Sequence, residues 1–363
     1  MSAVSSFPDN TGILICGHGS RAKIAEQEFG LLAARLRDRF PDLLIEYGFL
    51  EYSSPNIHMA LDRLISNGAR RICALPGMLF RATHAQNDIP SVLTTYMDRH
   101  PGLDIRYGVE LGLHPEMIRA FETRILEAVG LESIPRPGVL YDTMLVVVGR
   151  GTSVATANAE AAKLTRIVAE DLGFGWCETV YSGVTFPSVG RGLDMAVRLG
   201  FSRIVVAPYF LFSGRLVGRI HAYVNQAANT YPHVQFMLAD YLRDQGHVIN
   251  AFVARIEEVL SRTRQEPGLL EDFQTRLAAG KVAVHHHHAE YQPGHGPVPD
   301  SAHNHHHAPY RHIAHPHGPR TMIDENVCCC FMGQFPQTVI DEERQQRLQS
   351  TRLPADGRTP QCK

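Results

Sequence analysis

No apolar run in the sequence is long enough to cross a membrane, and residues 1–12 lack the basic region and apolar stretch of a signal peptide. A large excess of charge of one sign is also missing. The formal net charge is -2, which favours neither nucleic acid nor an anionic membrane as a partner. Cysteine is scarce, and Cys16, Cys73 and Cys177 lie in or beside apolar segments, where buried reduced thiols are expected. The seven cysteines do not form the framework of a disulfide-rich secreted protein, so we expect a cytoplasmic protein.

Short apolar segments alternate regularly with amphipathic segments along most of the chain. In the first half we expect strands at 13–16, 43–49, 71–75 and 103–109, and helices at 22–40, 55–67, 84–99 and 115–129. Strands and helices that alternate at this interval indicate βαβ units, which build a parallel sheet with right-handed crossovers.

The second half repeats this order. Strands are expected at 144–148, 177–182, 203–207 and 234–240, and helices at 154–172, 187–199, 216–230 and 248–261. An offset of 132 residues, the distance from His18 to Arg150, relates the halves without insertions from the first turn to the third strand. Pairs that keep this spacing include Pro55 and Pro187, Asp62 and Asp194, Gly68 and Gly200, Arg71 and Arg203, and Pro76 and Pro208. The sequence therefore predicts an internal duplication.

The expected fold is α/β, with two tandem lobes that each hold a four-stranded parallel sheet flanked by helices and enclose a cleft between them. We expect the first lobe at 1–130, a linker with Pro and Gly at 131–142, and the second lobe at 143–264. Residues 265–363 are expected to form a disordered tail that is rich in His and contains Cys. Because each lobe could serve as the other's partner, a monomer is slightly favoured over a homodimer.

The turn after the first strand carries the first candidate catalytic residue, His18. It lies between Gly17 and Gly19, after a buried apolar run and before a helix. Ligands of open α/β sheets bind beyond the carboxyl ends of the strands, and glycine lets a ligand approach the backbone closely. The same turn in the second half carries Arg150 in place of the histidine.

A second histidine, His84, follows the third strand, and the second half has Leu216 at that position. Two neutral imidazoles at corresponding strand ends suit a borderline divalent metal such as cobalt, nickel, iron or zinc. Two ligands leave the site open, which suits a metal that is handed on, whereas a structural site is closed by four. Taken singly, either histidine would more often be a capped or core residue, whereas the two together, both replaced in the second half, favour a metal site.

Three motifs resemble those of the sirohydrochlorin cobaltochelatases, the CbiX family of class II chelatases. They are GHGSR at 17–21, GFLE at 48–51 and H-x-x-x-D-I-P at 84–90. The resemblance covers roughly residues 12–261 and the composition of the tail, and it is to the long form with two domains. It implies a lyase that inserts cobalt(II) into sirohydrochlorin, a step of tetrapyrrole chemistry toward cobalamin.

The resemblance also implies roles for individual residues. His18 would be a metal ligand and the proton acceptor, and His84 the second metal ligand. The residues implied to contact the tetrapyrrole are Glu51, Met78, Leu79, Phe80, Arg81, Ala82 and Thr83. The family often has a glycine-bearing loop before the second histidine, where this chain has Arg-Ala-Thr, so the substrate loop is expected to differ in shape.

Insertion of a metal removes the pyrrole N–H protons and replaces the metal's water shell with ring nitrogens. A neutral histidine can act as the base at pH 7. One nitrogen cannot hold the metal and take a proton at the same time. Either His18 alternates between these roles, or His84 holds the metal while His18 takes the protons.

Arginines flank the strand ends of both halves, namely Arg21 and Arg81 in the first and Arg150, Arg215 and Arg219 in the second. Guanidinium groups bind carboxylates well, and sirohydrochlorin carries many of them. The second half is therefore predicted to have exchanged a metal site for an anion-binding face, with Arg150 as its main residue. The alternative is that these are solvated surface arginines.

Of the 20 histidines, twelve lie between His285 and His317. The candidate accessory metal ligands of the tail are His285, His286, His287, His288, His303, His305, His306, His307, His312, His315, His317, Cys328, Cys329 and Cys330. Such tracts bind metal by composition, so a metal reservoir or delivery arm is predicted, with a solubilising linker or a tag as alternatives. The three adjacent cysteines lack the usual C-x2-C spacing, and an iron–sulfur cluster with Cys362 or soft-metal and redox-sensing thiols both stay open.

Three further functions are considered. The same fold could act on sirohydrochlorin with iron or nickel, because two histidines do not choose among these metals. The chain could instead store or deliver metal with an inactive chelatase body, which the intact His18 and His84 oppose. In a histidine phosphatase His18 would be the phosphorylated nucleophile, but no motif beyond the nearby Arg21 supports it.

Overall fold

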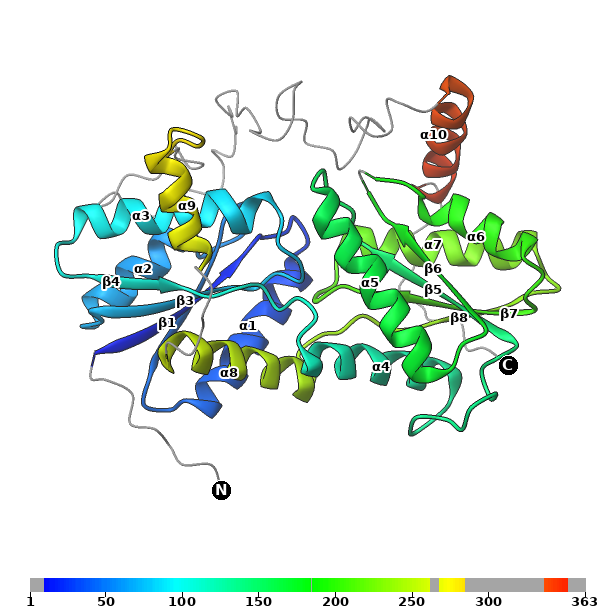
Figure 1. Cartoon of the computed structure of the whole chain (residues 1–363), viewed down its shortest axis with the longest axis horizontal. Coiled ribbons are helices and arrows are strands. Elements are labelled where there is room, and N and C mark those ends of the chain that lie inside the picture. Colours follow the sequence, from blue (N-terminus) through cyan, green and yellow to red (C-terminus); the bar gives the residue numbers. More distant parts are fainter. Residues whose placement is uncertain (1–9, 184, 262–267, 285–335, 352–363) are drawn as a thin grey trace. The chain divides into compact units, whose positions relative to one another are not determined.

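The structure, a computed structural model, describes residues 10–183, 185–261, 268–284 and 336–351 (Figure 1). These residues fall into two compact units, the first within Met1–Gly112 and Ile249–Arg320 and the second within Leu113–Val248 and Thr321–Lys363. Each unit is built on a four-stranded parallel sheet, which confirms the expected α/β fold. In the part of the chain that is described, no helix is both long enough and apolar enough to cross a membrane.

The sheet of the first unit has the strand order β2-β1-β3-β4. Its strands are β1 (Thr11–Gly17), β2 (Leu44–Phe49), β3 (Arg71–Pro76) and β4 (Asp104–Tyr107). The helices are α1 (Lys23–Arg39), α2 (Ile57–Ser66), the π-helix η1 (His84–Asp88), α3 (Ile89–Arg99), most of α8 (Gly246–Ser261) and α9 (Leu269–Ala278). Because β1 and β3 are parallel neighbours, the segments that follow them, with His18 and His84, leave the same edge of the sheet.

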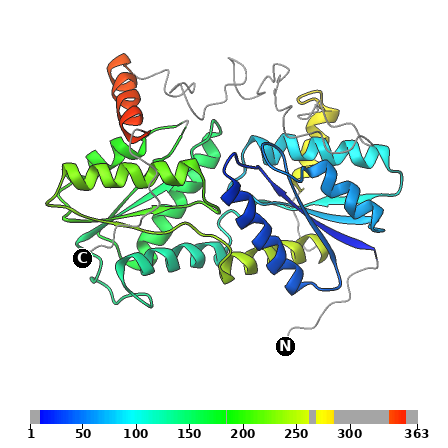
Figure 2. The same ribbon diagram turned by 180° about the vertical axis from the view of Figure 1, so that it is seen from behind.

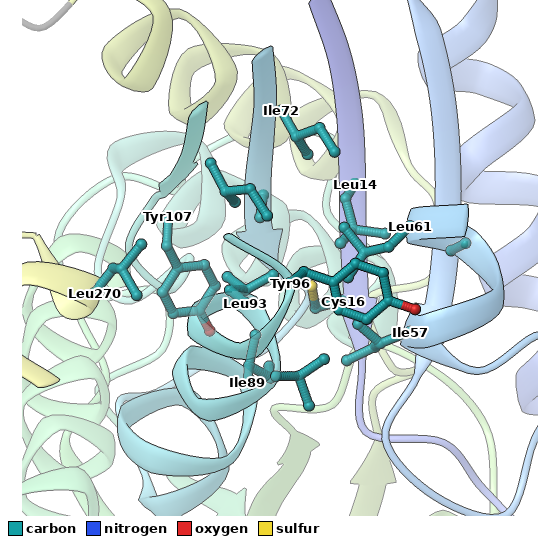
Figure 3. Packing of buried hydrophobic residues seen from close by; sticks show 14 of the residues in the cluster. Leu14, Cys16, Ile57, Leu61, Ile72, Ile89, Leu93, Tyr96, Tyr107 and Leu270 are labelled. Atoms are coloured by element: carbon teal, nitrogen blue, oxygen red, sulfur yellow. The ribbon is translucent and has the colours of Figure 1, made fainter. Parts of the chain in front are cut away.

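The central strands of the first sheet, β1 and β3, are buried on both faces, as their continuous apolar runs predict. Leu14 and Ile72 point to one face, where they pack with side chains of α2, α3 and α9 (Figure 3). Helices α1 and α8 cover the other face (Figures 1 and 2). Cys16 and Cys73 are fully enclosed, and burial raises the pKa of Cys73 to about 12, so both thiols are neutral and unreactive at pH 7.

The second unit has the matching strand order β6-β5-β7-β8. Its strands are β5 (Thr143–Gly149), β6 (Trp176–Tyr181), β7 (Arg203–Pro208) and β8 (Gln235–Leu238). The helices are α4 (Pro115–Val129), α5 (Ala155–Leu172), α6 (Val189–Arg198), α7 (Arg215–Thr230) and α10 (Gln337–Thr351). Val146 and Val206 of this sheet pack against α6 and α7, in the way that Leu14 and Ile72 pack in the first.

The last helix of each sequence half belongs to the unit of the other half. In the second unit, the α4 ring of Phe121 lies 5.0 Å from that of Tyr209, and Arg124 donates a hydrogen bond to the carbonyl of Leu242. In the first unit, Val259 of α8 fills the space beside Gly108. The lobe limits expected from the sequence, 1–130 and 143–264, follow the repeat, whereas the compact units divide the chain after Gly112 and Val248.

The stretch 265–363, expected to be a disordered tail, contains two helices among its described residues. Helix α9 buries Leu269, Leu270 and Phe273 in the first unit. Helix α10 contacts α6 through an ion pair of 3.0 Å between Glu342 and Arg191. The apolar residues of α9 span only ten positions, and so short a periodicity does not separate α9 from a polar tail by sequence alone.

Candidate active site

The loop after β1 is held in place by contacts that leave no room beside its glycines. A Cβ atom on Gly17 would lie 2.7 Å from the ring of Phe49, and one on Gly19 would lie 1.7 Å from the carbonyl oxygen of Glu51. Gly19 also has a φ of +92°, which favours glycine. The N–H of Glu51 donates to the carbonyl of His18 over 3.0 Å. The loop that presents His18 is thus packed on the loop after β2.

The turn that presents His84 is a π-helix with a buried carboxylate at its end. His84 Nδ1 lies 2.5 Å from Oδ2 of Asp88, whose side chain is fully buried. A carboxylate accepts hydrogen bonds, so Nδ1 carries the proton and Nε2 carries the lone pair of the neutral ring. A carboxylate that fixes the tautomer in this way is the usual partner of a metal-binding histidine.

The two histidines meet at the edge of the first sheet. Their ring centroids are 4.6 Å apart and the ring planes are almost perpendicular, at 87°. Nδ1 of His18 lies 3.2 Å from the carbonyl oxygen of Gly19, which assigns the proton to Nδ1 and the lone pair to Nε2. Among the described residues no group of three or more His, Cys, Asp and Glu side chains is placed to hold a metal ion. With each proton assigned to Nδ1, both rings keep the Nε2 lone pair.

The side chains of Glu51, Tyr52 and Arg21 form a polar cluster. The guanidinium of Arg21 lies over the ring of Tyr52, with its central carbon 4.9 Å from the ring centroid. Burial raises the pKa of the Tyr52 hydroxyl, and the charge and hydrogen bond of Glu51 add to this effect while Arg21 opposes it. Tyr52 has a φ of +60°, an uncommon value for a residue with a side chain. Sequence reasoning gave Tyr52 no role, and only its place beside Glu51 hints at one.

The stretch 78–83, expected to contact the tetrapyrrole, is anchored in the first unit. The carbonyls of Met78 and Leu79 accept hydrogen bonds from Leu111 and Gly112, over 3.0 Å and 2.7 Å. Met78, Leu79, Phe80 and Ala82 are partly exposed, Arg81 is exposed and Thr83 is buried. The side chain of Arg81 pairs with Asp272 of α9 over 3.3 Å.

Comparison with known proteins identifies the family. The sequence model of CbiX matches this chain twice, at residues 12–128 and 144–259. This chain belongs to the CbiX family. It is 31% identical to the sirohydrochlorin cobaltochelatase of Priestia megaterium, over 71% of this chain and 79% of the relative. It is 28% identical to the sirohydrochlorin ferrochelatase of Bacillus subtilis, over 69% of this chain and 92% of the relative.

Solved structures agree with this assignment. SirB from Bacillus subtilis with Fe3+ matches with a TM-score of 0.62 and 26% identity, and the match covers 72% of this chain and 99% of SirB. The two matches to CbiX confirm the internal duplication, and the resemblance read from the three sequence motifs is confirmed at the level of the family.

The second CbiX repeat keeps the backbone of the site but not its imidazoles. A Cβ atom on Gly151 would lie 2.1 Å from the carbonyl oxygen of Gly183, as Gly19 approaches Glu51. Arg150 stands exposed in the position of His18. Leu216 and Ile220 stand where the first repeat has His84 and Asp88, and α7 begins there without a π-helical turn. The second repeat has therefore lost both the histidines and the buried carboxylate.

Asp88 is the functional residue that sequence reasoning did not assign. The signal was present, because Asp88 follows His84 by four residues in a segment expected to be helical, which places both on one face. The predicted tail ligands, His285 to His317 and Cys328 to Cys330, lie outside the described residues, and so does Cys362.

Proposed function

We propose that this CbiX-family protein is a sirohydrochlorin chelatase that inserts cobalt(II) to give cobalt-sirohydrochlorin in cobalamin biosynthesis. The observation that carries the proposal is the close pair of imidazoles, His18 and His84, at the edge of the first sheet. The relative that is 31% identical over 71% of this chain, a cobaltochelatase, supports both the reaction and the metal.

In this proposal His84 is the residue that holds the substrate metal. Asp88 accepts a hydrogen bond from the Nδ1–H of His84, which keeps the Nε2 lone pair available. A borderline divalent ion such as cobalt(II) is well matched to imidazole nitrogen. Because the pair supplies two nitrogens, most of the metal's ligands are exchangeable waters, and the ion can pass on to ring nitrogens.

His18 is the residue that takes protons from the tetrapyrrole. Its Nδ1–H is hydrogen-bonded to the backbone carbonyl of Gly19, which leaves the lone pair on Nε2 to accept a proton. A neutral imidazole within hydrogen-bond reach of a pyrrole N–H is a suitable base near pH 7. His18 acts either as the base alone, with His84 on the metal, or alternates between the metal and the proton.

The remaining substrate contacts are assigned to the loops that frame the two histidines. Glu51 and residues 78–83 frame the pair in the first unit, and Arg21 adds a cation next to Tyr52. Guanidinium groups match the carboxylates of sirohydrochlorin. We further propose that Arg150 of the second repeat binds substrate carboxylates.

Iron is the second candidate metal. The ferrochelatase of Bacillus subtilis is 28% identical to this chain, and SirB was solved with Fe3+. Two imidazole ligands bind cobalt(II), iron(II) and nickel(II) alike, so metal supply and geometry decide among them.

The test is the absorbance change when the purified protein is mixed with sirohydrochlorin and cobalt(II), iron(II) or nickel(II) in turn. The proposal expects conversion faster than the protein-free rate, and fastest with cobalt(II). Faster conversion with iron(II) would make the protein a ferrochelatase. No conversion above the protein-free rate with any metal, together with stoichiometric metal binding, would indicate the storage or delivery protein instead.

A further inference from the structure

Helix α9, which lies outside both CbiX repeats, packs directly on the turn that carries His84. Leu269 and Leu270 belong to the same buried cluster as Ala85 and Ile89 (Figure 3). The helix contacts η1, α3 and β4. Its apolar side therefore fixes α9 against the element that presents the proposed metal ligand.

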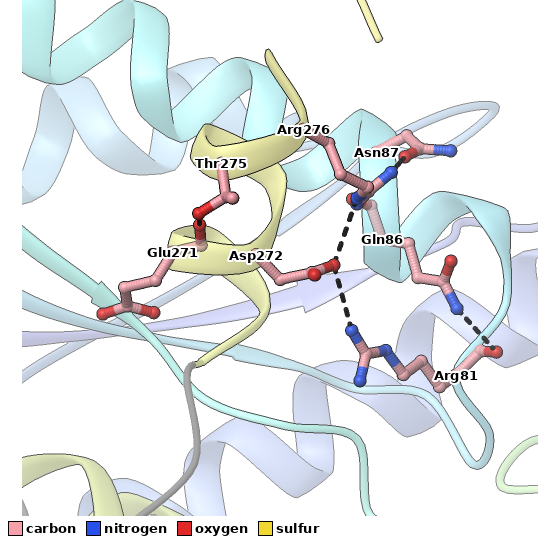
Figure 4. Close-up of polar contacts among 7 residues, drawn as sticks. All are labelled: Arg81, Gln86, Asn87, Glu271, Asp272, Thr275 and Arg276. Atoms are coloured by element: carbon pink, nitrogen blue, oxygen red, sulfur yellow. Dashed lines mark hydrogen bonds and ion pairs between the residues drawn. The ribbon is translucent and has the colours of Figure 1, made fainter. Parts of the chain in front are cut away.

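The polar side of α9 reaches the same turn through Arg276 (Figure 4). Its Nη1 donates to Oδ1 of Asn87 over 2.8 Å, and its Nη2 donates to the carbonyl oxygen of Gln86 over 2.9 Å. Its Nε donates to Asp272 over 3.1 Å, and Asp272 also pairs with Arg81 over 3.3 Å. One guanidinium thus binds two consecutive residues of η1 and is itself held by a carboxylate.

The Gln86 carbonyl lies where the π-helical turn passes into α3, and Pro90 leaves a gap among the N–H donors there. In an α-helix each carbonyl accepts a hydrogen bond from the N–H four residues further along the chain. For Gln86 that residue is Pro90, which has no N–H. The N–H of Ile89 reaches back to the carbonyl of His84, one residue further than in an α-helix. The proline of the H-x-x-x-D-I-P motif therefore removes the donor at the place where Arg276 supplies one.

Gln86 and Asn87 lie between His84 and Asp88, so their position sets the geometry of the His84–Asp88 pair. Asn87 is buried, and the side chain of Arg276 is only 24% exposed, so it has little freedom to swing away. We infer that Arg276 is a positioning residue for His84: it replaces the N–H that Pro90 lacks and holds the π-helical turn in the shape that binds metal. This inference rests on the proposed chelatase function, to which it adds a residue outside the CbiX repeats.

The test compares four full-length variants with the wild type: Arg276→Ala, Pro90→Ala, the double variant, and Gln274→Ala. Gln274 is exposed on the same helix and serves as the matched control. Arg276→Ala is expected to raise the KM for cobalt(II) about tenfold and to leave the KM for sirohydrochlorin unchanged. Gln274→Ala is expected to match the wild type in both constants.

Pro90→Ala restores a backbone N–H that can donate to the Gln86 carbonyl. In the double variant it is expected to lower the raised cobalt(II) KM of Arg276→Ala most of the way back to the wild-type value. If Arg276 mattered only for the packing of α9, the Pro90→Ala substitution would not restore the cobalt(II) KM. A double variant as impaired as Arg276→Ala would contradict the role given to the Gln86 carbonyl, and a normal cobalt(II) KM in Arg276→Ala would overturn the inference.

Amide hydrogen exchange of residues 84–91 gives a second readout that needs no turnover. Exchange there is expected to speed up in Arg276→Ala and to slow again in the double variant. If exchange follows this pattern but the wild type shows no chelatase activity, the positioning role stands and the proposed function fails. Unchanged exchange in Arg276→Ala would contradict the positioning role, whatever the activity.

Discussion

At the scale of single residues, the hydrogen bond between Asp88 and His84 decides which nitrogen of the ring can bind metal. Asp88→Asn keeps the shape of the side chain but replaces an obligate acceptor with a group that can also donate. The other tautomer of His84 then becomes accessible. We expect the KM for cobalt(II) to rise about tenfold to a hundredfold, with the fold intact by circular dichroism. An unchanged KM for cobalt(II) would show that the buried carboxylate does not orient the ring.

The close contact of Gly19 with the Glu51 carbonyl predicts a second residue-scale effect. Gly19→Ala would place a methyl group on a backbone oxygen and force the His18 loop to move. Gly68→Ala is the matched control, because Gly68 has a similar φ of +94° but nothing within 4 Å of a Cβ atom.

Both alanine variants carry the same backbone strain, about 1 kcal/mol in the free energy of unfolding. Gly19→Ala is expected to lose more stability and to slow chelation about a hundredfold, since small displacements of a catalytic group are costly. Thermal unfolding and initial rates measure the two effects. Equal losses of rate in both variants would mean that the contact with Glu51 does not position His18.

At the scale of elements, the contact between helices α4 and α5 contains Glu122, whose carboxyl group ionises less readily than usual. Burial raises the pKa of Glu122 to about 7, and the charge of Asp171 and its hydrogen bond add to the shift. A raised carboxyl pKa means that the folded state binds the proton more tightly than the unfolded state. The stability from this group is therefore complete below about pH 4.5 and is lost as the pH rises through about 7.

Glu122→Gln removes this titration. The variant is expected to be more stable than the wild type at pH 8, by about 1 to 3 kcal/mol, and of similar stability at pH 4. Denaturant unfolding at the two pH values measures the difference. The exposed Glu132→Gln is the control and should change neither value. A gain in stability of the same size at pH 4 would contradict the assigned cause.

Most elements could be predicted from the sequence, because apolar runs and amphipathic periods mark buried strands and helices directly. The segment 115–129 was predicted with the ends that α4 has, and the expected start of a helix at His84 is confirmed. The π-helical turn could not be predicted, since a shift of one residue in hydrogen bonding leaves the pattern of apolar side chains almost unchanged. The role of Arg276 could not be predicted either, because its partners lie far away in sequence and nothing in the sequence of α9 marks a long-range contact.

At the scale of the whole molecule, the duplication kept one fold but not the same side chains after its strands. The two sheets share strand order and the same close-packed glycine after the first strand. The first repeat has the imidazoles and the buried carboxylate, and the second has Arg150, Leu216 and Ile220 at those positions. Of the site, the histidine pair could be predicted by comparing the repeats, whereas the groups that orient it required the structure.

If Arg150 binds substrate carboxylates, as proposed, changing it alters substrate binding alone. Arg150→Glu is expected to raise the KM for sirohydrochlorin about tenfold, because it replaces attraction with repulsion, and to leave the KM for cobalt(II) unchanged. Arg136→Glu, in the exposed linker, changes the net charge equally and serves as the control. The same KM for sirohydrochlorin in both variants would refute an anion-binding role for Arg150.

The most direct test of the central claim is the cobalt-dependent spectral conversion of sirohydrochlorin by the wild type, His18→Ala and His84→Ala. The account predicts conversion by the wild type and none above the protein-free rate in His18→Ala at any cobalt(II) concentration. His84→Ala should recover part of its rate as cobalt(II) is raised, because it lacks a metal ligand but keeps the base. Wild-type rates in His18→Ala would contradict a chelatase centred on this histidine pair, and identical losses in both variants would contradict the division of roles between them.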